Sequence, residues 1–198
     1  MPNNISIVVS APSGTGKTSI ITKAIEENDR FVFVVSTTTR PQRNGESEGE
    51  SYYYVSQDDF KQMIVRGEFL EWAVVHQNYY GTSKKEVDRI KGLGKIPIFD
   101  VDVQGAKQLK GKIKNAVFIF IVPPSIDELR TRLVNRGTDS EHQVSIRLNN
   151  AVNEMRDYRI YDYIIVNHDL TEAAEDFKAI IRAERCNVKR FAPDMIRL

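Results

Sequence analysis

A short loop near the start of the chain has the residue types of a phosphate-binding site. The loop reads Ala11-Pro12-Ser13-Gly14-Thr15-Gly16-Lys17-Thr18, and it joins an apolar run at 5–10 to a helical pattern that begins at 19. A strand, a glycine-rich loop, Gly-Lys-Thr and a helix follow one another in this order in a P-loop. Backbone N–H groups of such a loop and of the helix N-terminus converge on an anion. The loop therefore predicts a site for nucleotide phosphates.

Two side chains of this loop have specific chemistry. Lys17 can reach β- and γ-phosphates, and the hydroxyl of Thr18 can bind Mg²⁺. The first glycine of the consensus is replaced by Ala11, whereas Gly16, Lys17 and Thr18 match it. A glycine-rich turn with a chance lysine is the alternative, but the apolar run before the loop and the helical pattern after it favour a P-loop.

Composition restricts the class of protein. The 198 residues suit one domain with small insertions, and 41% hydrophobic and 28% charged residues are typical of a soluble globular protein. A net charge of +1 favours neither nucleic acid nor a membrane as partner. The single cysteine, Cys186, excludes an intrachain disulfide and a cysteine-based zinc cluster. Without a transmembrane run or a signal peptide in the sequence, we expect a cytoplasmic protein.

Alternating apolar runs and helical patterns predict the elements that position the loop. Further strands are expected at 31–35, 96–99, 117–122 and 163–166, and their continuous apolar character is typical of a parallel sheet buried on both faces. Ser125 and Glu128 form a capping-box pattern before a helix, and a last helix is expected at about 172–188. The pattern predicts an α/β fold: a P-loop kinase core with a doubly wound parallel sheet.

Two segments interrupt this alternation. Residues 36–92, here called the insertion, have a polar, turn-rich start, expected strands at 52–55 and 69–75, and between them a short helix capped at Ser56. Residues 125–159, here called the lid, are helical and rich in arginine. The core would then comprise 1–35, 93–124 and 160–198. Insertions on both sides of a phosphate site suit an enzyme that closes over two substrates.

Several motifs beyond the P-loop follow one another in a characteristic order. They are Ser-Ala-Pro-Ser-Gly at 10–14, Ser-Thr-Thr-Thr-Arg at 36–40 with Arg43, Glu-Trp at 71–72, Asn-Tyr-Tyr-Gly-Thr at 78–82, Asp-Val-Asp-Val-Gln-Gly at 100–105, and Arg-Gly at 136–137. In order and spacing they resemble those of the guanylate kinases, nucleoside monophosphate kinases that make GDP from GMP and ATP. The resemblance covers about 5–185, and Ala11 fits it, because this family commonly has a small residue there.

The resemblance implies ATP with Mg²⁺ as phosphoryl donor and GMP, with dGMP as a second acceptor. It implies an acceptor-phosphate site in which arginine forks and tyrosine hydroxyls hold a dianion; the matching residues are Arg40, Arg43, Tyr52 and Tyr80. It implies guanine recognition by Ser36, Glu71, Thr82 and Asp102, with Gly81 in the same motif. Taken alone, Arg40 and Arg43 also fit a solvated turn, Tyr52 a packed strand aromatic, and Glu71 the solvent face of an amphipathic strand.

The acidic motif at 100–105 combines two roles. Asp100 follows an apolar strand, the Walker B position, where a carboxylate supports the Mg²⁺ shell. In a continuing strand Asp100 and Asp102 would share a face, because side chains alternate. Metal and guanine could then be served by one acidic pair, and the sequence leaves open which aspartate serves which.

The lid supplies cations for the transferred phosphoryl group, according to the resemblance. These are Arg132 and Arg136, four residues apart on one expected helix face, and Arg147 on the next helix. Without the family pattern, a solvated basic helix face is the usual interpretation. No histidine lies in a recognisable general-base setting, and a monophosphate needs none, because it is largely ionised at pH 7.

Three alternatives remain beside the guanylate kinase hypothesis. A kinase for another monophosphate would share the P-loop but would not explain Ser36, Glu71 and Thr82 together. A non-catalytic guanylate-kinase-like interaction module usually lacks an intact P-loop. A GTPase switch would need an Asn-Lys-x-Asp type reader, which this sequence does not contain. The sequence does not distinguish a monomer from a homo-oligomer.

Overall fold

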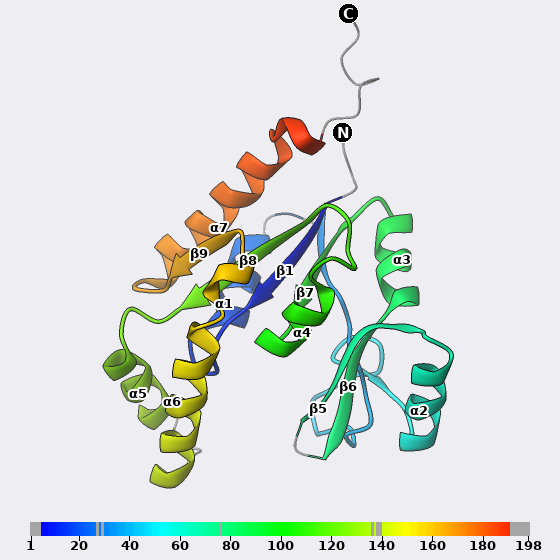
Figure 1. The fold of residues 1–198 in the computed structure, drawn as a ribbon, viewed down its shortest axis with the longest axis horizontal. Helices are drawn as coiled ribbons and strands as arrows, with labels where there is room; N and C mark the ends of the chain where they lie inside the picture. Colours follow the sequence, from blue (N-terminus) through cyan, green and yellow to red (C-terminus); the bar gives the residue numbers. More distant parts are fainter. Residues whose placement is uncertain are drawn as a thin grey trace, which may run out of the picture.

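The structure is a computed structural model that describes residues 5–26, 28, 30–75, 77–135, 137 and 140–190. Within them, a five-stranded parallel sheet forms the centre of the molecule, in the order β2-β7-β1-β8-β9 (Figure 1). Its strands are β1 (Ser6–Ser10), β2 (Phe31–Phe33), β7 (Ile96–Asp100), β8 (Ala116–Val122) and β9 (Tyr163–Val166). The doubly wound parallel sheet expected from the apolar runs is confirmed.

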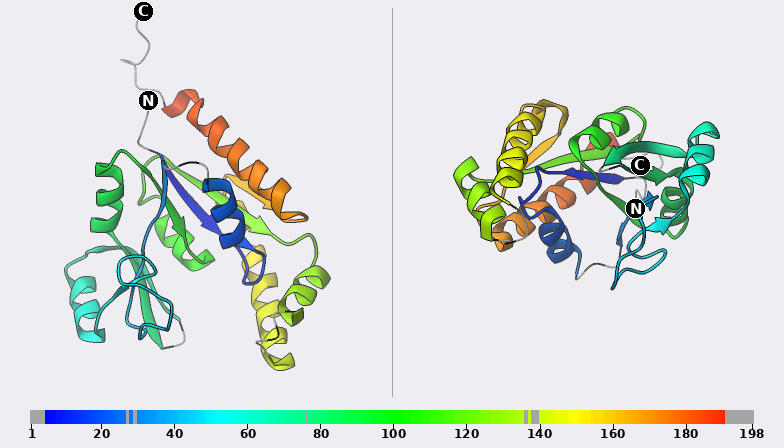
Figure 2. Two further views of the ribbon diagram at one scale, coloured as in Figure 1. Left: turned by 180° about the vertical axis from the view of Figure 1, so that it is seen from behind. Right: turned by 90° about the horizontal axis from the view of Figure 1, so that it is seen from below.

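Helices cover both faces of this sheet. Alternate side chains of each strand point to opposite faces, so apolar strands present an apolar layer on each face. On one face, Ile7 and Ile119 pack with Ile20 of α1 (Lys17–Ile25) and Phe177 of α7 (Leu170–Arg185). On the other face, Val8 and Phe99 pack with α3 (Lys84–Gly92) and α4 (Val103–Leu109). Figure 2 shows α1 and α7 together on one side of the sheet and α4 on the other.

The insertion contains a second sheet, with the order β4-β3-β6-β5 in the described part of the chain. Its elements are β3 (Thr37–Thr38), β4 (Tyr53–Tyr54), α2 (Gln57–Val65), β5 (Phe69–Val75) and β6 (Asn78–Ser83). Ser56 caps α2 by accepting a hydrogen bond from the backbone of Asp59. The expected strand at 69–75 and the capped helix are confirmed, whereas β3 and β6 were not predicted as strands.

The lid consists of α5 (Ile126–Asn135) and α6 (Glu141–Met155), which pack through Leu129, Leu133, Val144 and Leu148. Short 3₁₀ helices follow at Tyr158–Ile160 (η1) and Val188–Arg190 (η2). In Figure 1, α5 and α6 lie on one side of the carboxyl ends of β1 and β8, and β5, β6 and α2 lie on the other. None of the helices in the described ranges has both the length and the apolar composition needed to cross a bilayer.

Candidate active site

The loop after β1 has the geometry of an anion-binding turn. Gly14 and Gly16 have φ angles of +94° and +88°, a left-handed conformation that glycine adopts without steric cost. The Thr15 hydroxyl donates to the carbonyl of Pro12 at 2.7 Å, and the side-chain amide of Asn167 donates to the carbonyl of Thr15 at 2.6 Å. The residues from Ala11 to Ser19 line a cavity of about 350 Å³, together with Asp102 and Glu154.

Lys17 and Thr18 meet Asp100 at the carboxyl end of β7. The Lys17 Nζ atom lies 2.5 Å from Asp100 Oδ1 and donates to the carbonyl of Val101 at 2.8 Å. The Thr18 hydroxyl donates to Asp100 Oδ2 at 3.3 Å. A hydroxyl and a carboxylate are hard oxygen ligands of the kind that Mg²⁺ uses beside phosphate and water. Among the described residues there is no cluster of three or more His, Cys, Asp or Glu side chains suited to hold a metal by protein ligands alone.

A second cavity, of about 290 Å³, adjoins the first between the two sheets. Among the residues that line it are Ser36, Tyr52, Glu71, Tyr80, Gly81, Asp100 and Asp102. Asp102 lines both cavities. The expectation that one strand carries both aspartates on the same face is wrong: β7 ends at Asp100, and Asp102 is the N-cap of α4, where its Oδ1 accepts from Gly105 N–H at 2.7 Å.

Glu71 is a buried carboxylate in the wall of the second cavity. Only 7% of its surface is exposed, so the interpretation of Glu71 as a solvent-facing strand residue is wrong. The Thr82 hydroxyl donates to its Oε1 atom at 2.6 Å. Burial raises the pKa of Glu71, and the charge of Asp102 raises it further, although the bond from Thr82 acts in the opposite direction. Such a group gains most from a ligand that donates hydrogen bonds to it.

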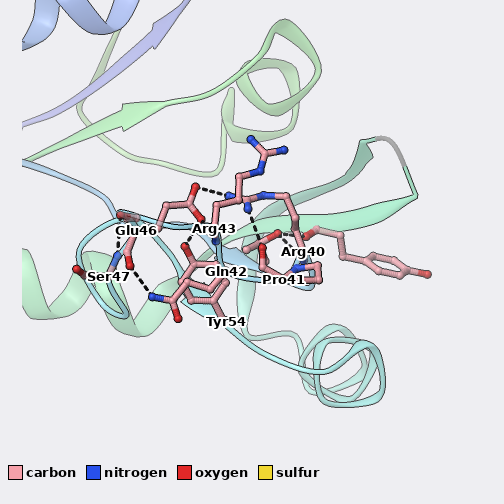
Figure 3. A network of polar contacts seen from close by, with 10 residues as sticks. Arg40, Pro41, Gln42, Arg43, Glu46, Ser47 and Tyr54 are labelled. Atoms are coloured by element: carbon pink, nitrogen blue, oxygen red, sulfur yellow. Dashed lines mark hydrogen bonds and ion pairs between the residues drawn. The ribbon is translucent and has the colours of Figure 1, made fainter.

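Arg40 and Arg43 of the insertion are organised by Glu46, a residue that the motifs did not point to (Figure 3). Its Oε1 atom accepts from Arg40 at 2.6 Å, and its Oε2 atom accepts from the Arg43 backbone at 2.8 Å and from the Tyr54 hydroxyl at 2.7 Å. These donors lower the pKa of Glu46 to about 2 and raise that of Arg40. Glu46 therefore stays ionised, and it holds the first residues of the insertion in place through Arg40 and the backbone of Arg43.

Aromatic rings join Arg40 to the second cavity. The Arg40 guanidinium lies 5.3 Å from the ring centre of Tyr52, which meets Tyr80 edge-on at 5.9 Å. Tyr52 and Tyr54 contact one another, whereas Tyr53 points the other way and donates to Glu86 at 3.0 Å. Tyr52 and Tyr54 thus face one way and Tyr53 the other, as alternate residues of an extended chain do.

The predicted lid cations that the structure describes are Arg132 and Arg147. Arg132 donates to Glu128 at 2.8 Å and to the carbonyl of Asn167 at 3.0 Å, and Arg147 lies on α6. Neither lines the two cavities just described. Arg136, the third predicted cation, lies outside the described residues. The residues that line the two cavities therefore form two adjoining sets, whereas Arg132 and Arg147 lie on α5 and α6.

Sequence reasoning missed Glu46, Glu154 and Asn167. Asn167 directly follows β9, and the carboxyl ends of parallel strands meet at one edge of the sheet. Its position in the sequence could therefore have placed it beside the P-loop. Glu154 belongs to the last turn of α6, where an acidic residue usually faces solvent. Nothing in its local pattern indicated that it would line the P-loop cavity.

A doubly wound parallel sheet with a P-loop after its first strand, and a second cavity at its carboxyl edge, defines a nucleotide-binding protein of the P-loop class. The family model described as guanylate kinase matches residues 3–184. This match spans most of the chain, and the chain therefore belongs to the guanylate kinase family.

Similar proteins support this assignment. The chain is 45% identical to the guanylate kinase of Geobacter metallireducens, over 92% of this chain and 90% of that protein. It is also 45% identical to the guanylate kinase of Thermotoga maritima, over 92% and 88%. Among solved structures, the guanylate kinase from Anaplasma phagocytophilum superposes with a TM-score of 0.75 at 34% identity, over 94% of this chain and 89% of that one.

Proposed function

We propose that this chain transfers the γ-phosphoryl group of ATP to GMP, giving ADP and GDP. One observation carries the proposal beyond the family: the P-loop cavity adjoins a second cavity with a buried carboxylate, and Asp102 lines both. A donor in one cavity and an acceptor in the other would meet near Asp102. In-line transfer requires two substrates held end to end in this way.

The acceptor is activated by its own chemistry. The phosphate of a nucleoside monophosphate has a second pKa of about 6 and is largely a dianion at pH 7, so no protein base is required. The barrier is charge repulsion between two polyanions. Lys17 would bind the donor phosphates, Arg40, Arg43, Tyr52 and Tyr80 the acceptor phosphate, and Arg132, Arg136 and Arg147 the transferring group. The residues of the P-loop, from Ala11 to Thr18, would supply backbone donors for ATP.

Thr18 and Asp100 fit a magnesium ion that accompanies ATP. Their oxygen atoms lie next to one another and next to Lys17 at the P-loop. A bound Mg²⁺ would neutralise charge on the β- and γ-phosphates. We assign Thr18 as a direct ligand of the metal and Asp100 as the carboxylate that supports its water ligands. Asp102 is the less suitable aspartate for this role, because it caps α4.

The second cavity suits guanine. The N1–H and N2–H₂ groups of guanine are donors, and Glu71 and Asp102 present carboxylate oxygens to the cavity. Adenine has an acceptor at N1, which would face a buried carboxylate and leave it without a donor. Sites built from buried hydrogen bonds discriminate by about 10⁴ or more. Ser36 and Gly81 complete the wall, and Thr82 orients Glu71.

Closure would bring the lid arginines to the two substrates. The insertion (36–92) would carry the acceptor and the lid (125–159) the cations, while the core holds ATP. Closing over the substrates also excludes water, which could otherwise accept the phosphoryl group.

The single cysteine supports a location in the reducing cytoplasm.

A coupled assay for ADP, with ATP, Mg²⁺ and a panel of acceptors, tests the proposal. GMP should give the highest kcat/KM and dGMP a lower but measurable one, whereas AMP, UMP and dTMP should give little turnover. The variant Lys17→Ala, checked for folding by circular dichroism, should lose about 10²–10³-fold in kcat. Preference for AMP would contradict the guanine assignment, and near-normal kcat in folded Lys17→Ala would contradict a catalytic P-loop.

A further inference from the structure

The side chain of Gln108 on α4 binds both backbone groups of one residue in β5. Its Oε1 atom accepts from the N–H of Trp72 at 3.2 Å, and its Nε2 atom donates to the carbonyl of Trp72 at 2.9 Å. Close by, Lys112 Nζ donates to the carbonyl of Leu70 at 2.8 Å. The core therefore holds the residues immediately before and after Glu71.

These contacts complete an edge strand. In the order β4-β3-β6-β5, β5 has a neighbouring strand on one side only. The outward N–H and C=O groups of an edge strand lack partners in the sheet. A side-chain amide offers both an acceptor oxygen and N–H donors, so it can replace the peptide group of a neighbouring strand. Gln108 thus fastens β5 of the insertion to α4 of the core at Trp72.

The same helix carries the other carboxylate of the second cavity. Asp102 caps α4, and Gly105 lies in its first turn. A Cβ atom added to Gly105 would lie 3.2 Å from Glu71 Oε2 and 3.3 Å from Asp102 Oδ1, so both carboxylates pack closely around this glycine. The distance between Glu71 and Asp102 is consequently set by how β5 sits on α4.

We infer that Gln108 is a positioning residue for base recognition: by holding the backbone of Trp72, it keeps Glu71 at the spacing from Asp102 that the acceptor base requires. The inference rests on the proposed function. Gln108 lines neither cavity, so it acts through Glu71. Lys112 supports the same strand from the other side of Glu71.

Gln108→Leu keeps the approximate size of the side chain and removes both hydrogen bonds. The KM for GMP should rise about 5- to 20-fold, and the ratio of kcat/KM for GMP to that for AMP should fall by a similar factor. The KM for ATP and kcat at saturating GMP should stay within about twofold. Gln62→Leu, the same change on α2, is the matched control and should leave all four quantities unchanged.

Gln108→Glu keeps the acceptor for Trp72 N–H and loses the donor to the Trp72 carbonyl. Because a carboxylate oxygen would then face that carbonyl and repel it, the KM for GMP should rise at least as much as in Gln108→Leu, and this variant provides the decisive measurement if Gln108→Leu does not fold. A folded variant with unchanged KM and unchanged GMP-to-AMP ratio would overturn the inference. So would an equal loss of kcat with both acceptors. Failure of the wild type itself to phosphorylate GMP would instead overturn the proposed function.

Discussion

Glu71 is a buried carboxylate in the wall of the second cavity. With 7% exposure and Asp102 nearby, its ionised form is disfavoured, and its pKa is raised. Guanine would supply two N–H donors to this carboxylate and so favour the ionised form. Base binding and ionisation of Glu71 are therefore linked, and the acceptor should bind best where the carboxylate is already ionised.

This linkage predicts a pH dependence. As pH falls through the raised pKa of Glu71, the unliganded carboxylate takes up a proton that GMP must displace, so the KM for GMP should rise. The measurement is KM for GMP across the pH range from neutral to mildly acidic. Glu71→Gln should lose this added dependence and should weaken the use of GMP by about 1–3 kcal/mol at neutral pH.

The phosphate of GMP also titrates, with a pKa of about 6, and it does so equally with both enzymes. Comparison of the wild type with Glu71→Gln therefore isolates the contribution of Glu71. The raised pKa has a consequence for folding too: the folded state holds the proton more tightly than the unfolded state, so this carboxylate lowers stability as pH rises above its unfolded pKa. Identical pH profiles for the two enzymes, or a Glu71→Gln variant that uses GMP normally, would remove Glu71 from the site.

Among the elements, the P-loop and α5 are in direct contact. A Cβ atom on Gly14 would lie 2.8 Å from Leu133 Cδ2 and 3.1 Å from Leu129 Cδ1. Both leucines belong to the packed interface of α5 and α6. The phosphate loop and the lid therefore share one packing surface, and a change at Gly14 should affect both.

Gly14→Ala tests this contact. Left-handed backbone strain and the clash with Leu133 should together lower the free energy of unfolding by about 1–3 kcal/mol, measured by denaturant titration, and the KM for ATP should rise. Gly67→Ala is the control, because Gly67 also has a positive φ, +65°, but no atom within 4 Å of an added Cβ. It should lose only the strain energy and keep the KM for ATP. Equal effects of the two substitutions on stability and KM would contradict the shared surface.

Arg132 on α5 provides a second test at the level of one element. It bonds to Glu128 and to the carbonyl of Asn167, the residue whose side chain holds Thr15 in the P-loop. If Arg132 stabilises the transferring phosphoryl group, Arg132→Ala should reduce kcat by about 10³-fold or more. Arg130→Ala, an exposed arginine on the same helix, should leave kcat unchanged. A loss confined to the KM for ATP would indicate that Arg132 only holds the P-loop.

At the scale of the whole molecule, the apolar runs were sufficient to predict the parallel sheet, because strands buried on both faces carry their signal locally. The expected runs at 96–99 and 117–122 agree with β7 and β8, whose side chains are almost all buried. In contrast, β3 consists of two threonines that pair with β4 on one side and β6 on the other. That pairing depends on segments that lie far away in the sequence, so a local pattern could not reveal it.

The candidate site shows the same division. Ser36, Glu71 and Asp102, which the motifs pointed to, line the second cavity, and their roles remain predictions. The motifs could not predict that Asp102 caps a helix or that Gln108 fastens β5, since both depend on where the insertion sits on α4. The resemblance supplied the roles of Arg132 and Arg147, and these roles remain predictions.

The central claim is that the molecule joins two substrates and moves a phosphoryl group from one to the other. The most direct measurement follows the label from γ-labelled ATP in the presence of GMP, Mg²⁺ and catalytic amounts of protein. We predict that the label appears in GDP, in amounts equal to the ADP formed, with little in inorganic phosphate. Label that appears only in inorganic phosphate at a rate independent of GMP, or no release from ATP at all, would contradict the account.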